Sequence, residues 1–197
     1  MEVKILDVKG FEIAARAIRL AYNSKPQNIT PKLHKSKFAG DEQLNHDDYN
    51  LMLKLLNNND SHSKGLRMIQ VWLEITAPRF WWAEFDTYKV GTVTCSESTV
   101  HTIKKKPLDA GNFEKGLILA ETLDALNKAI ENQDDLVWVK SILPESFLQK
   151  RIVCTNYQTL KHMYYDRKTH PLPQWKIFLD FLDGLPYINL IKTDKEK

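Results

Sequence analysis

Apolar residues recur along the chain in two patterns, one that favours strands and one that favours helices. Alternation with polar residues predicts strands over Val3–Val8 and Met68–Thr76. Helices are expected where apolar residues return every three or four positions. The predicted helices are Phe11–Asn23, a helix capped by Asp47 or Asp48, the stretch after Pro78 that carries Trp81, Phe85 and Tyr88, the long segment Phe113–Ile130, and a helix from Trp175 that stops at Gly184.

The segment Lys25–His46 breaks this pattern, because it is polar, lysine-rich and interrupted by proline and glycine. Long loops in compact domains are usually functional or mobile. Its lysines are either a flap that attracts phosphate or a solvated surface. The 197 residues are enough for one core, so we expect a single domain over residues 1–190 and a flexible tail over 191–197.

A further helical stripe ends in a charged residue. Asn156, Leu160, Met163 and Arg167 are spaced at i, i+4, i+7 and i+11, which places them on one face of a helix. Arg is seldom fully buried unless it is paired. The stripe therefore predicts that Arg167 either meets an anion, a carboxylate or a bound phosphate, or reaches solvent from the last helical turn.

The same region resembles the C-terminal block of the flavin-dependent thymidylate synthases, the ThyX family. That block has Leu-Pro, then Asn-x-Arg at a helix start, an Arg three turns later, and Gln-Trp opening the next helix. The matching residues are Leu143, Pro144, Asn156, Leu160, Arg167, Gln174 and Trp175. The block aligns without a gap, but Gln158 stands where the family has the Arg of Asn-x-Arg.

The family's phosphate-binding signature, Arg-His-Arg-x-x-Ser, is altered in this chain. Alignment on Ala77-Pro78 places it on Thr87–Thr92, so Lys89 keeps a positive charge and Thr92 keeps a hydroxyl, whereas Tyr88 replaces the His. Replacing Arg at a bidentate phosphate site is not conservative. We therefore expect an inherited scaffold with a rebuilt site.

Other family positions are also retained only in part. The same alignment places His62 on a family His and Arg67 on a Glu, which reverses a charge. Ser96 lies near the Ser-x-Arg with which the family's signature continues downstream. Lys140 stands where the family has an Arg that contacts dUMP. His62 is interpreted either as a flavin neighbour or as a solvated loop residue.

The resemblance implies an α+β fold of the ThyX type, a mixed sheet with a helical bundle, that binds FAD and a dUMP-like pyrimidine nucleotide. It implies that Arg167 polarises the base, as the catalytic residue. The other implied contacts are Lys140, Lys89, Thr92 and Ser96 for the substrate, and His62, Tyr88, Asn156 and Gln158 for the flavin. It also implies a homotetramer.

Composition and residue spacing argue against several other classes of protein. A net charge of +3 gives no argument for nucleic-acid binding, and no apolar run approaches the roughly 20 residues of a spanning helix. Cys95 and Cys154 are isolated, which predicts free, buried thiols in a reducing, cytoplasmic protein. The histidines lack ligand spacing, so no metal site is expected.

Two functions stay open. The first is a flavin-dependent methyl or hydride transferase that acts on a pyrimidine nucleotide and needs no enzyme nucleophile, since the protein orients cofactor and substrate. The second is a non-catalytic protein of the same fold that senses a nucleotide or binds a protein partner. The replacement of the signature at Thr87 and Tyr88 favours the second.

Overall fold

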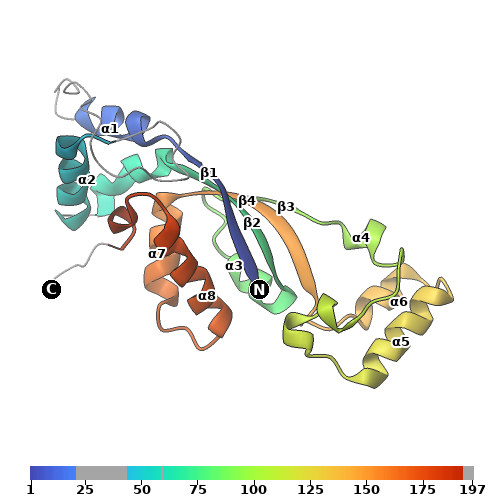
Figure 1. Ribbon diagram of the computed structural model, residues 1–197. Coiled ribbons are helices and arrows are strands. Elements are labelled where there is room, and N and C mark those ends of the chain that lie inside the picture. The colour runs from blue at the N-terminus through green and yellow to red at the C-terminus, as the bar shows by residue number, and fades with distance from the viewer. Residues whose placement is uncertain (21–43, 59, 193–197) are drawn as a thin grey trace. The chain divides into compact units, whose positions relative to one another are not determined.

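A computed structural model describes residues 1–20, 44–58 and 60–192, apart from the side chains of residues 57–62. Within these ranges, four strands form one antiparallel sheet in the order β1-β2-β4-β3 (Figure 1). Their bounds are Glu2–Lys9 for β1, Gln70–Pro78 for β2, Val93–Ser96 for β3 and Leu148–Asn156 for β4. Every second residue of β2 is buried, which is the period-two pattern that made this strand predictable.

The remaining described residues form helices and short 3₁₀ turns between the strands. The α-helices are α1 (Phe11–Leu20), α2 (His46–Asn58), α3 (Arg79–Phe85), α4 (Thr99–Thr102), α5 (Ala120–Glu131), α6 (Leu136–Ser141), α7 (Tyr157–Arg167) and α8 (Pro173–Phe181). The 3₁₀ helices are η1 (Asp60–Met68), η2 (Ala110–Asn112), η3 (Glu114–Gly116), η4 (Leu182–Gly184) and η5 (Ile188–Leu190). No helix of the described residues is both long enough and apolar enough to cross a bilayer.

Contacts divide the chain into two compact units. The larger comprises Val3–Glu74, Tyr88–Thr94 and Val153–Lys197. In it, α1, α2 and α7 all contact η1, and α7 lies against α8 (Figure 1). The helix faces meet in an apolar core whose fully buried members include Phe11, Leu56, Ile69, Tyr157, Leu160, Met163, Trp175 and Phe178.

The smaller unit comprises Met1–Glu2, Ile75–Thr87 and Cys95–Ile152. Here α5 and α6 lie side by side (Figure 1). They pack on a separate hydrophobic core, formed by Ile103, Leu108, Phe113, Leu126, Ala129, Ile130, Val139, Leu143 and Phe147. The prediction of one domain over residues 1–190 stays a prediction, and residues 193–197 of the predicted tail lie outside the described ranges.

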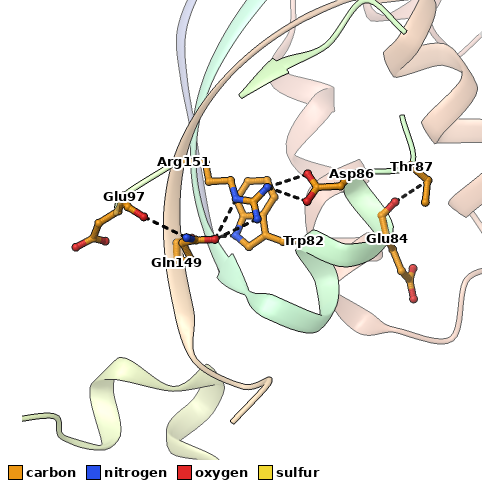
Figure 2. Close-up of polar contacts among 7 residues, drawn as sticks. All are labelled: Trp82, Glu84, Asp86, Thr87, Glu97, Gln149 and Arg151. Atoms are coloured by element: carbon orange, nitrogen blue, oxygen red, sulfur yellow. Dashed lines mark hydrogen bonds and ion pairs between the residues drawn. The ribbon is translucent and has the colours of Figure 1, made fainter. Parts of the chain in front are cut away.

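A polar network within the smaller unit fastens the end of α3 to β4 (Figure 2). The Arg151 guanidinium lies over the Trp82 indole, 4.2 Å from the ring centroid, and its Nη1 bonds both oxygens of Asp86 at 2.8 and 3.1 Å. Its Nε and Nη2 donate to Gln149 Oε1, and the Trp82 indole N–H donates to the Gln149 carbonyl. Since Arg151 holds the Asp86 carboxylate, we assign Asp86 a structural role.

Three predicted helices need correction. Phe113–Ile130 is not one helix, because Lys115 and Gly116 both have positive φ and the α-helix begins only at Ala120. The helix after Pro78 ends at Phe85, so Tyr88 is not on its face. The cap of α2 is neither Asp47 nor Asp48, since Asn45 Oδ1 accepts from the backbone N–H of Asp48 at 2.7 Å.

Some other predictions concern residues outside the described ranges, and the prediction of buried cysteines is partly wrong. The end of the predicted helix Phe11–Asn23 and most of the loop Lys25–His46 lie outside the described residues. Asp48 pairs with Arg19, a buried ion pair between α2 and α1. Both cysteines are free, but Cys95 is exposed rather than buried, because all four residues of β3 are exposed. Burial raises the pKa of the half-buried Cys154 thiol.

Stability should fall steeply at alkaline pH because of Tyr157. Burial, and secondarily the neighbouring Tyr187, raise the pKa of its phenol well above 10, and its hydroxyl donates to the Pro186 carbonyl. Above about pH 10 the unfolded chain loses this proton while the folded chain keeps it. The free energy of unfolding should therefore drop by about 1.4 kcal/mol per pH unit from this group alone.

Urea unfolding at pH 9 to 11 checks this prediction. Tyr157→Phe should be less stable than the unmodified chain at pH 8, by about 1–3 kcal/mol, because the Pro186 carbonyl loses its donor. Its alkaline slope should nevertheless be shallower by about 1.4 kcal/mol per pH unit. Equal slopes in the two proteins would contradict the assignment.

Candidate functional site

The loop Tyr88–Thr92 is fixed against the beginning of α7 by side chains of β4 and α7. The Asn156 side-chain amide donates to the Gly91 carbonyl at 3.2 Å, and the Thr159 hydroxyl donates to the Val90 carbonyl at 3.0 Å. The hydroxyls of Thr92 and Thr155 share a hydrogen bond of 3.1 Å. These bonds tie the altered signature to a rigid helix end.

Asn156 performs two structural tasks at once. Its Oδ1 accepts from the Thr159 backbone N–H at 3.0 Å, which caps α7. Its Nδ2 reaches back to the loop at Gly91, which has φ +73°. A side chain on Gly91 would overlap the Asn156 amide nitrogen, so this close approach requires glycine.

Arg167, at the end of α7, is held by aromatic side chains. Its Nε donates to the Tyr88 hydroxyl at 2.9 Å. Its Cζ lies 4.8 Å from the Trp175 ring centroid and 5.5 Å from that of Tyr88. Trp175 is fully buried in the first turn of α8, so it presents a fixed face to the half-buried guanidinium. Such stacking is typical of Arg and is unavailable to Lys in the same form.

The Tyr88 phenol links two charges. It accepts from Arg167, and its own O–H donates to Asp166 Oδ2 at 3.3 Å. Burial, the largest influence, raises the pKa of Tyr88, although Arg167 acts in the opposite direction. The phenol is therefore neutral at physiological pH and can donate and accept at once.

No protein-family model matches the sequence, and no curated protein matches it. Solved structures do match it, and two of them match over its whole length. Both are the flavin-dependent thymidylate synthase ThyX from Helicobacter pylori with FAD and dUMP, and each match covers 100% of both chains at 19% identity, with TM-scores of 0.74 and 0.75. This chain has the fold of the flavin-dependent thymidylate synthases.

In the thymidylate synthase fold adopted here, the larger unit contains most of the site residues that the family resemblance singled out. They are Tyr88, Lys89, Thr92, Asn156, Gln158 and Arg167. The hydrogen bonds above join the loop, the cap and the end of α7 into one assembly. Lys89 is exposed beside Tyr88 in the same loop. The α+β class predicted from sequence is confirmed.

Gln158 lies in the first turn of α7 and is 5% exposed. Its Nε2 lies 3.0 Å from His162 Nε2, so the histidine tautomer decides which nitrogen donates. Its Oε1 has no hydrogen-bond partner among the described residues. An unpaired buried acceptor is costly and is often explained by a ligand or a bound water.

The other predicted site residues belong to the smaller unit or have side chains outside the described residues. Ser96 at the end of β3 and Lys140 on α6 are exposed and belong to the smaller unit. His62 falls within η1, but its side chain is outside the described part of the chain. No group of three His, Cys, Asp or Glu among the described residues is arranged to hold a metal ion.

Sequence reasoning missed two kinds of site residue. Thr155 and Thr159, which hold the loop, were not singled out, although Asn156-x-x-Thr159 is the spacing of a helix cap. Trp175 was noted only as part of the resemblance and not as a partner of Arg167. Its position on the next helix leaves no local signal of the contact.

Proposed function

We propose that this chain is a divergent flavin-dependent thymidylate synthase that binds a dUMP-like pyrimidine nucleotide together with FAD. One observation carries the proposal: a fold that the Helicobacter pylori enzyme uses with FAD and dUMP is combined here with a guanidinium fixed by Tyr88 and Trp175. A half-buried, oriented guanidinium is suited to polarising a pyrimidine carbonyl, because its donors need no reorganisation when charge develops.

The residues around the N-terminus of α7 fit a flavin in their chemistry. After capping and loop contacts, Asn156 has one Nδ2 hydrogen left, and Gln158 Oε1 is an acceptor without a partner in the described residues. A donor and an acceptor are the groups that a ring carrying both carbonyl and imide groups pairs with. Tyr88 and His62 are the other residues proposed near the cofactor. FAD, when bound and reduced, would supply a hydride.

The nucleotide would be held by cations and hydroxyls of this chain. Arg167 would orient the base, and Lys89 and Lys140 would attract the phosphate, each as a point charge without the bidentate geometry of Arg. Thr92 and Ser96 would add hydroxyl hydrogen bonds. Thr92 already shares one with Thr155, so it keeps one further donor or acceptor function. Assembly as a homotetramer in the cytoplasm completes the proposal.

A specific observation favours a second function, a non-catalytic nucleotide sensor or protein-binding module. Asn156 is largely committed to capping and loop contacts, and the Tyr88 hydroxyl is engaged by Arg167 and Asp166. Gln158 replaces a cation at the cofactor position. A chain that has lost its flavin contacts would still bind the nucleotide through Arg167, which is what a sensor requires.

Reconstitution with FAD separates these two functions. The purified chain, incubated with FAD and desalted, should keep a visible flavin spectrum, and dUMP should raise its melting temperature by several degrees. FAD retention with a dUMP shift supports the enzyme. A dUMP shift in a colourless protein supports the sensor. A colourless protein without a dUMP shift contradicts both the enzyme and the nucleotide sensor, and leaves the protein-binding module.

A further inference from the structure

The proposed function depends on Arg167, which is the last residue of α7 and has a long, flexible side chain. Fixing such a side chain costs about 2 kcal/mol of rotamer entropy if binding must do it. A polarising group also has to sit within about 0.5 Å of its productive place. Whatever holds the guanidinium before the ligand arrives is therefore part of the site.

Two contacts of Arg167 restrict different motions. The Trp175 face, at 4.8 Å, limits the tilt of the guanidinium plane. The Nε–H bond to the Tyr88 hydroxyl, at 2.9 Å, fixes the rotation of that plane, because Nε–H lies within it. Together the two contacts hold the guanidinium in one plane.

The Tyr88 hydroxyl is itself oriented. Its ring lies edge-on to Trp175 with centroids 6.1 Å apart, and its O–H points to Asp166 Oδ2. The oxygen therefore presents a lone pair to Arg167 and not its hydrogen. A buried aromatic ring and a carboxylate that accepts the hydroxyl hydrogen therefore orient the phenol oxygen as an acceptor.

We infer that Tyr88 is a positioning residue that acts through Arg167, setting the guanidinium for the pyrimidine. The inference rests on the proposed function for its ligand, although the contact itself is independent of it. It gives the replacement of the signature His by Tyr88 a physical consequence: the side chain at this position serves the base-polarising arginine of the same unit.

A double-mutant cycle tests the inference, with dUMP affinity measured by isothermal titration calorimetry. Tyr88→Phe keeps the ring and removes the acceptor, so dUMP binding should weaken about tenfold. In the Arg167→Ala background the same change should cause no further loss. Tyr165→Phe, a matched change of a half-buried tyrosine on α7, should leave the affinity unchanged. Equal losses in both backgrounds, or an unchanged affinity in Tyr88→Phe, overturn the inference.

A second measurement does not require dUMP. In the unmodified chain the Arg167 Nε–H should exchange with water at least about tenfold more slowly than that of the exposed Arg16, as followed by NMR. Exchange should accelerate in Tyr88→Phe. Equal rates for the two arginines overturn the inference even if dUMP binds. If dUMP does not bind the unmodified chain, the nucleotide proposal fails, and the exchange rates alone decide whether Tyr88 positions Arg167.

Discussion

Arg167→Ala is expected to weaken dUMP binding by about 10- to 100-fold, since a charge-assisted hydrogen bond to the ligand contributes about 1.5–3 kcal/mol. Turnover, where it can be measured, should fall by about 10²–10³, the usual effect of removing one donor to a developing oxyanion. The side chain also packs on Trp175 and bonds Tyr88, so the variant should unfold about 1–2 kcal/mol more easily. Calorimetric titration with dUMP, beside urea unfolding, separates the two effects.

Arg16→Ala is the matched control, because Arg16 is an exposed arginine on α1. It should leave both dUMP affinity and stability within measurement error. The account of the site is wrong if Arg167→Ala and Arg16→Ala bind dUMP equally well. It is also wrong if the loss in Arg167→Ala is no larger than its stability change explains.

Gly91→Ala should destabilise the chain by about 2–4 kcal/mol. An L-residue at φ +73° costs about 1–2 kcal/mol, and the added methyl must displace the Asn156 side chain, whose capping bond contributes about as much. The loop Tyr88–Thr92 would lose one of its bonds to the start of α7, so dUMP binding should weaken as well. Urea unfolding gives the stability change directly.

Gly184→Ala is the control for this substitution. Gly184 has no positive φ, and a methyl there would meet only the tip of Ile5 at an ordinary van der Waals distance of 3.8 Å. This change should be neutral or slightly stabilising, because it reduces the entropy of the unfolded chain. Similar destabilisation by the two substitutions would show that the contact between Gly91 and Asn156 is unimportant.

The elements that sequence predicted well are those with a strong local pattern. The stripe Asn156, Leu160, Met163 is buried as expected, with Asn156 as the cap and Arg167 half-buried at the end of α7. The strand predicted over Met68–Thr76 is shifted by only two residues, because alternation is explicit in its sequence. Pro78 does precede a helix, although it serves as the N-cap and not within the first turn.

The elements that were predicted wrongly depend on contacts between residues distant in sequence, which residue spacing does not report. Phe113 and Leu117 fit a helical period, yet the backbone turns at Lys115, Leu117 is 65% exposed and Phe113 bridges to Phe147, distant in sequence. Periodicity reports which residues share a face and not whether the backbone turns between them.

Prediction of the site from sequence meets the same limit. The sequence predicted that Arg167 either meets an anion or reaches solvent from the last helical turn. The partners that the structure places around it include the Tyr88 hydroxyl and the Trp175 face, which lie 79 positions earlier and on the next helix. Aromatic partners of this kind carry no charge pattern in the sequence. They had to be found in three dimensions.

Growth of a thymidylate synthase-deficient cell without thymidine tests the central claim most directly. The claim is that this fold, with its altered signature, still makes thymidylate through a fixed arginine. Expression of the unmodified chain should restore growth, and the Arg167→Ala variant, produced at the same level, should not. Failure of the unmodified chain to restore growth while it is abundant and retains FAD would contradict the claim.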